Sequence, residues 1–72
     1  MGSMQDRIMD AAVGMGGQFT TAEMAMALFG DTKRGHMTHV RARLASLVDW
    51  GLLSRVGRVN VGGVLMMVWR VP

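Results

Sequence analysis

The stretch HMTHVRARLASLVDWGLLSRVGRV, residues 36–59, decides the fold, because it contains the clearest helical pattern of the chain and the signal that ends it. Its apolar residues recur at the spacing of one helix face: Met37, Val40, Leu44, Leu47 and Val48. Gly51 follows, and glycine readily adopts the left-handed conformation in which helices end. We therefore predict a helix that starts near Thr32 or near Gly35 and stops before Gly51.

The N-terminal part of the chain has the signals of a short amphipathic helix. Ser3 and Asp6 are typical of a helix N-cap that is followed by an acidic first turn. Glycines within residues 14–17 supply the signal that ends a helix. We therefore predict a first helix over about residues 4–14.

A capping box predicts a second helix. Thr20 and Glu23 stand three residues apart, so that each side chain can accept a hydrogen bond from the backbone of the other residue. Gly30 ends this segment. The helix is therefore expected over about residues 21–29, and its alanines permit the close approach of another helix.

After Gly51 the apolar residues change to the period of two that is typical of strands. The segment NVGG, residues 60–63, is the best candidate for a turn between two strands. One set of alternate residues in the second strand comprises Leu65, Met67, Trp69 and Val71. Arg70 marks the other side of the strand as solvent-facing, so we expect Trp69 to point into the core.

Together these segments predict a single domain over residues 1–72, mostly α with a small β-hairpin, in which three helices precede two strands. The first helix is expected to pack across the other two, and the hairpin is expected to cover one end of the core. Residues 1–3 are compatible with a cloning remnant and receive no functional weight.

The composition argues against several classes of protein. The chain has no cysteine, so disulfides and thiolate metal sites are not available to it. No apolar run reaches the ~18 residues of a membrane span, and no leader pattern opens the chain, so we expect a cytoplasmic protein without a membrane partner. Nucleophile motifs, paired carboxylates and phosphate loops are all missing, so we expect neither an enzyme nor a cofactor.

Charge is distributed unevenly along the chain, although the formal net charge is only +3. Residues 1–31 hold one arginine and four acidic residues, whereas residues 32–58 hold six basic residues and one acidic residue. This asymmetry creates a local positive field, and a polyanion is the obvious partner for such a field. A solvated basic face produces the same pattern.

The segments FTTAEMAMALFG, residues 19–30, and VRARLASLVDWGLLSRVGRV, residues 40–59, resemble the winged helix-turn-helix family of DNA-binding domains. The first segment is similar to the second helix of that family, and the second segment to its third helix and the start of its wing. The resemblance covers residues 4–72 and implies double-stranded DNA as the partner, with the third helix in the major groove and the wing on the backbone or minor groove. Between Leu28 and Val40 this chain is longer than the tightest helix-turn-helix units.

With the apolar stripe turned inward, steps of about 100° per residue place small and polar residues on the exposed face of the third predicted helix. On this face Thr38 and His39, together with Arg43, are the candidates for contacts with base edges. Arg41 lies on the other flank, close to the edge of the core.

The other candidate DNA contacts lie at the start of this helix and in the hairpin. The candidates for phosphate contacts before and within the helix are Thr32, Lys33, Arg34, His36 and Arg41. The candidates in the wing are Arg55, Arg58 and Asn60. Arg55 is explained almost equally well as a strand arginine that covers the edge of the core.

Two observations leave other functions open. His36 and His39 are three residues apart, as in some metal sites, but Asp31 is the one nearby carboxylate and we expect no metal. Among nine methionines, Met26 and Met66 are expected on the surface, where methionine suits a protein partner or a second copy of the chain. The resemblance favours a small transcriptional regulator of bacterial or mobile-element type. The alternative is a winged-helix module that binds another protein, or a second copy of itself as a homodimer, without DNA.

Overall fold

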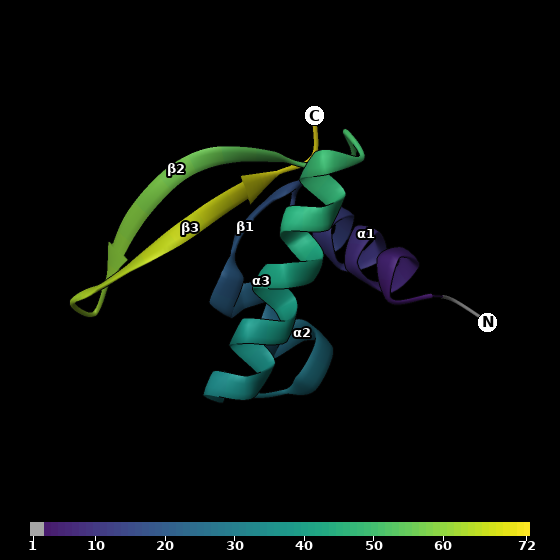
Figure 1. Ribbon diagram of the computed structural model, residues 1–72. Coiled ribbons are helices and arrows are strands. Elements are labelled where there is room, and N and C mark those ends of the chain that lie inside the picture. The colour runs from purple at the N-terminus through teal and green to yellow at the C-terminus, as the bar shows by residue number, and fades with distance from the viewer. Residues whose placement is uncertain (1–2) are drawn as a thin grey trace.

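The computed structural model describes residues 3–72, and within that range it contains three helices and one three-stranded antiparallel sheet (Figure 1). In chain order the elements are α1 (Met4–Gly14), β1 (Gln18–Thr20), α2 (Thr21–Phe29), α3 (Arg34–Asp49), β2 (Ser54–Val61) and β3 (Val64–Arg70). The α+β class, the three helices and the hairpin are confirmed. Of the segment set aside as a cloning remnant, residues 1–2 lie outside the described residues.

The predicted caps close the N-termini of α1 and α2. The hydroxyl oxygen of Ser3 accepts a hydrogen bond from the backbone N–H of Asp6, and the hydroxyl oxygen of Thr20 accepts from Glu23. Each acidic side chain accepts in return from the backbone N–H of its capping residue. A cap of this kind stabilises a helix by about 1 kcal/mol, so these two helices begin where the sequence indicates.

The C-terminus of α3 depends on Gly51, which has a φ of 78°. The backbone N–H of Gly51 donates to the carbonyl of Val48 at 3.0 Å. The N–H of Leu52 donates to the carbonyl of Leu47 at 2.9 Å. These two bonds satisfy carbonyl groups that the helix end would leave without partners, and they turn the chain toward β2.

The sheet contains a strand that the sequence pattern did not predict. β3 lies between β1 and β2, and β1 pairs with it so that Phe19 stands opposite Trp69. A strand of three residues is too short to display the alternation that identifies strands in a sequence. The two-stranded hairpin is as predicted, and the additional strand ties its base to the helices.

The core takes its side chains from all three helices, from β1, from β3 and from the turn before β2. Its buried hydrophobic residues are Ile8, Ala12, Phe19, Met24, Ala25, Val40, Leu44, Leu47, Leu53 and Trp69. Trp69 is 2% exposed, as predicted, and its indole Nε1–H donates to the hydroxyl of buried Thr21 at 2.9 Å. Both polar groups are thereby satisfied, and the hydrogen bond fixes β3 to the start of α2.

The helices pack in sequence, with α1 against α2 and α2 against α3 (Figure 1). We expected α1 to cross both other helices, but its backbone lies closer to α2. It reaches α3 through side chains, because Ile8 and Leu47 line the same small recess. None of the helices within residues 3–72 is both long and apolar enough to cross a membrane.

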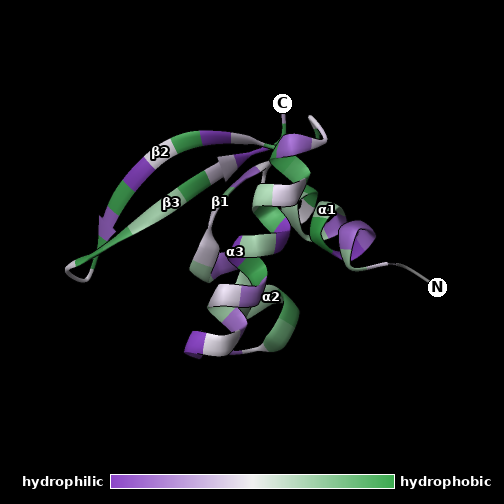
Figure 2. Ribbon diagram, viewed as in Figure 1, coloured by the Kyte–Doolittle hydropathy of each residue, from purple (hydrophilic) through white to green (hydrophobic). Residues whose placement is uncertain are grey.

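The hairpin extends beyond the helices and covers the core only with its base (Figure 1). Trp69 is buried there, but Leu65, which alternation places on the same side of β3, is 66% exposed. Leu65 and Trp69 lie on the same side of β3, as the alternation predicts. Leu65 is nevertheless exposed, because α1, α2 and α3 leave the outer half of the hairpin uncovered. Figure 2 shows that hydrophobic residues nevertheless continue along both strands toward the turn. Met66, which we expected on the surface, is partly buried and pairs with Val59.

Candidate nucleic-acid interface

The side of α3 that faces away from the core matches the face predicted from the sequence. Val40, Leu44 and Leu47 are buried against the other elements. Thr38 and His39 are exposed, although the His39 ring also meets the ring of Phe29 edge-on, with centroids 6.0 Å apart. These two polar side chains are therefore accessible to a ligand that lies along α3.

The two arginines in the middle of α3 lie on opposite flanks of the helix. Arg41 is exposed and lines a groove between α3 and the hairpin. Arg43 is exposed on the other flank, where it lines a recess together with Gln5 of α1 and Trp50. Arg41 is therefore the one of the two that can act together with the hairpin.

A bulge in β2 determines which side chains of the hairpin face α3. Arg55 pairs with Trp69 and Gly57 pairs with Val68, so Val56 between them is an extra residue. In a regular strand, residues three apart point to opposite faces of the sheet. Because the bulge adds one residue, Arg58 lies on the same face as Arg55.

The two hairpin arginines and Arg41 line one groove of about 410 Å³. Its floor includes Met37 and Ala45 of α3 and side chains of β3, and none of the residues that line it is acidic. Three cations on one groove without a neighbouring carboxylate produce a concentrated positive potential. This arrangement favours a ligand with several negative charges.

Arg55 has a structural role in addition to its place in the groove. Its guanidinium carbon lies 5.5 Å from the ring centroid of Trp69. At this distance a cation is attracted to the face of an indole ring. Arg55 therefore covers the edge of the core, as the structural alternative predicted, and it also presents its charge to the groove.

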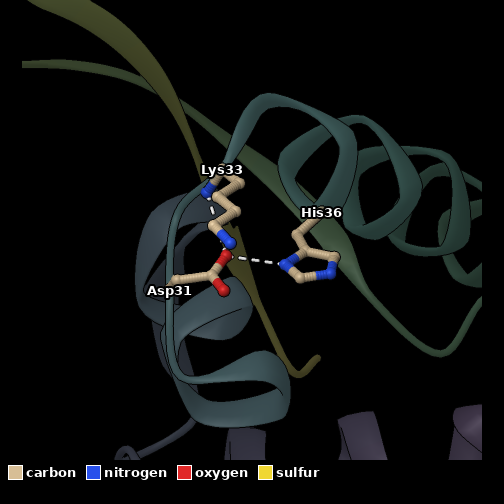
Figure 3. Close-up of polar contacts among 3 residues, drawn as sticks. All are labelled: Asp31, Lys33 and His36. Atoms are coloured by element: carbon tan, nitrogen blue, oxygen red, sulfur yellow. Dashed lines mark hydrogen bonds and ion pairs between the residues drawn. The ribbon is translucent and has the colours of Figure 1, made fainter.

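His36 is held by contacts within the protein at the turn before α3 (Figure 3). Its Nδ1 lies 2.6 Å from Oδ1 of Asp31, and its ring stacks on Phe29 with centroids 4.2 Å apart and an interplanar angle of 10°. A carboxylate oxygen only accepts, so Nδ1 of His36 carries the proton in this bond. His36 therefore anchors the turn, and its contact with DNA stays a prediction.

Asp31 organises the start of α3. Its Oδ1 also accepts a hydrogen bond from the backbone N–H of Lys33 at 3.0 Å (Figure 3). The hydrogen bond from His36, reinforced by that of Lys33, holds the pKa of Asp31 below its ordinary value of 3.8. Thr32, Lys33 and Arg34 are exposed around this turn, so their side chains can approach a ligand at the N-terminus of α3.

Asn60 closes the turn of the hairpin. Its Oδ1 accepts a hydrogen bond from the backbone N–H of Gly63 at 2.9 Å. The residue is exposed and stands opposite Leu65 in the ladder. The side-chain oxygen of Asn60 is therefore engaged in the turn, and the predicted DNA contact is left to its side-chain NH2 group.

The structure brings together some of the predicted site residues and separates others. Arg41, Arg55 and Arg58 converge on the groove, whereas Arg43 faces α1. The position of Leu65 on the same groove is not predicted by the sequence, because the alternation of β3 predicts that this side chain is buried. His36 and His39 do not belong to a metal cluster: among residues 3–72, no three His, Cys, Asp or Glu side chains lie close enough to hold an ion.

Comparisons with known protein families, characterised proteins and solved structures found no match to this chain.

Proposed function

We propose that this protein is a winged helix-turn-helix DNA-binding protein and acts as a small transcriptional regulator in the cytoplasm. The observation that carries the proposal is the groove between α3 and the hairpin, on which three arginines converge. Duplex DNA carries one negative charge per ~1.7 Å of its axis, so it offers the closely spaced anions that such a groove suits. The element order and the wing-like hairpin support the same function.

In this proposal α3 lies in the major groove, which is wide enough to admit a helix. Thr38 and His39 reach the base edges, and Lys33 and Arg34 contact phosphates beside the start of the helix. The strand of DNA backbone next to the major groove then lies in the groove between α3 and the hairpin. Arg43 is omitted from the base contacts, because it faces α1.

The test is a titration of a labelled pool of random duplexes with the wild type and with Arg41→Ala and Arg58→Ala. The wild type is expected to show salt-sensitive binding from about 50 mM salt upward, because binding releases counterions from the DNA. Each variant is expected to bind more weakly and to lower the slope of log K against log salt by about one, because one phosphate contact is lost.

Arg70→Ala is the matched control, because it removes one positive charge from the solvent-facing side of β3. Its effect on the slope is expected to be small, since Arg70 does not line the groove. Equal slopes for wild type, Arg41→Ala and Arg58→Ala would show that the groove does not contact phosphates. If the wild type shows no salt-sensitive binding, the proposal that the protein binds DNA is wrong.

A second candidate function is binding to another protein or to a second copy of this chain. The observation that favours it is Met26 on the outer side of α2, which is 52% exposed. It borders an open hollow lined by Met15, Ala22, Glu23, Met26, Ala27 and Thr32. Sedimentation of the wild type and of Met26→Lys separates the candidates: self-association through this hollow would be reduced by the substitution, and a monomer at high concentration excludes the homodimer.

A further inference from the structure

The tip of the hairpin is apolar, exposed and without charge. No charged residue occurs between Arg58 and Arg70. Near the turn, Val61, Val64 and Leu65 are 49%, 58% and 66% exposed. These side chains add nothing to the buried core, so the fold alone does not account for them.

The ladder register divides these apolar residues between two faces. Leu65 pairs with Asn60, and this pair lies on the same face as Arg58 and its partner Met67. The pair of Val61 and Val64 lies on the opposite face of the ladder, although Val64 also borders the groove beside the turn. Leu65 alone among the three therefore continues the row of side chains that begins with the arginines.

Leu65 also lines the groove that holds Arg41, Arg55 and Arg58. A ligand that rests on these arginines consequently meets an aliphatic side chain at the outer end of the same surface. Arg55 lies near the base of the hairpin, Arg58 near its middle and Leu65 next to its tip. This order fits a ligand whose anionic backbone is followed by a less polar recess.

The place of the tip relative to α3 points to the minor groove of a bound duplex. Each sugar–phosphate backbone of a duplex separates a major groove from a minor groove. With α3 in the major groove and this backbone on the arginines between α3 and the hairpin, the tip lies on the minor-groove side of the backbone. β2 has eight residues and extends for about 26 Å at ~3.3 Å per residue, and its outer half projects beyond the helices (Figure 1).

We propose that Leu65 enters the minor groove as an apolar wedge, while Arg55 and Arg58 hold the phosphates beside it. This inference rests on the proposed function, and it specifies which kind of DNA duplex the protein prefers. An aliphatic side chain that enters the minor groove separates stacked base pairs, and pyrimidine–purine steps resist this deformation least. The ligand is therefore a duplex with such a deformable step under the tip.

The experiment compares Leu65→Ala with Val61→Ala on duplex DNA over a range of salt concentrations. Leu65→Ala is expected to weaken binding by about fivefold to tenfold, because it removes an apolar contact of about 1–1.4 kcal/mol. The slope against salt should stay unchanged, since no phosphate contact is lost. Val61→Ala is the matched control, because Val61 is exposed on the opposite face and does not line the groove, and it is expected to bind as the wild type does.

A selection from a random duplex pool supplies a second measurement. The wild type is expected to enrich pyrimidine–purine steps at the position under the tip, and Leu65→Ala is expected to lose this preference. Leu65→Arg should restore affinity through a new phosphate or minor-groove charge contact and raise the salt slope by about one.

The outcomes separate this inference from the proposed function. If the wild type binds DNA with the expected salt dependence but Leu65→Ala is indistinguishable from it, the wedge is wrong and DNA binding stands. An equal loss in Leu65→Ala and Val61→Ala also overturns the wedge, because the two faces of the hairpin would then contribute equally. Binding of the wild type to vesicles of phosphatidylserine and phosphatidylcholine, abolished by Leu65→Ala, with no binding to duplexes, would assign the tip to a membrane surface and overturn both.

Discussion

At the turn before α3, a single residue, Asp31, makes the stability of the helix start depend on pH. Asp31 accepts hydrogen bonds from the His36 ring and from the backbone of Lys33. Both bonds favour the charged carboxylate and lower the pKa of Asp31 below 3.8. A lowered pKa in the folded state means that the carboxylate stabilises the fold above the ordinary pKa, and that this contribution disappears as the pH falls through the lowered value.

Asp31→Asn is therefore expected to be less stable than the wild type at pH 6, with a difference that shrinks as the pH falls below 3.8. Urea unfolding of both proteins across this pH range measures the difference. Asp10→Asn is the control, because Asp10 is exposed on α1, far along the chain from this turn. A difference that is constant with pH would show that the carboxylate charge of Asp31 has no part in the stability.

At the same scale, the sequence identified most of the candidate site residues but not their neighbours. Helical spacing alone placed Arg41 and Arg43 on different flanks of α3, and the structure agrees. The contacts of His36 could not be predicted from the sequence. They depend on the place where α2 ends and on the turn that brings Asp31 and Phe29 next to the His36 ring. The sequence also does not predict that Arg55 and Arg58 lie on the same face, since this depends on a bulge that no sequence pattern indicates.

At the scale of elements, local signals decided the helices and long-range pairing decided the sheet. α1 and α2 begin at capping boxes that involve residues three apart, and α3 ends at a glycine, so a single sequence predicts all three. β1 is a strand only because β3 lies beside it, and the pairing of Phe19 with Trp69 joins residues far apart in the chain. No local pattern reports such a contact.

The hairpin turn permits a prediction about this element. Gly62 and Gly63 have φ values of 59° and 87°, as in the type I′ turn that joins strands with two residues. Apart from the chain neighbours, no heavy atom of residues 3–72 lies within 4 Å of the place that a Cβ would take at either position, so the cost of a substitution there is conformational. Asparagine tolerates the left-handed region at the first position, whereas a β-branched residue does not at the second.

Gly62→Asn is therefore expected to keep the hairpin intact, and Gly63→Val to destabilise it by about 1–2 kcal/mol. Hydrogen exchange of the backbone amides in β2 and β3 measures this effect directly, because the tip opens without unfolding the core. Faster exchange in Gly63→Val alone is the expected result. The same acceleration in Gly62→Asn would show that the turn is not of the type I′ form.

At the scale of the whole molecule, a chain of 72 residues has a small margin of stability. Proteins are stable by ~0.05–0.15 kcal/mol per residue, which corresponds to about 4–11 kcal/mol here. The core consists of ten buried hydrophobic residues, and Leu44 lies among them without exposure to solvent. The interface residues of the groove are exposed and lie outside this core.

Leu44→Ala is consequently expected to cost about 2–5 kcal/mol, a large part of the total, because it leaves a cavity in the centre of α3 packing. Urea unfolding followed by circular dichroism measures the loss, with Ala42→Ser on the exposed face of α3 as the control. Arg41→Ala and Arg58→Ala should unfold at nearly the wild-type urea concentration, since exposed substitutions change stability by less than ~0.5 kcal/mol. If they unfold as early as Leu44→Ala, the groove arginines hold the fold together, and their loss of DNA binding would no longer identify an interface.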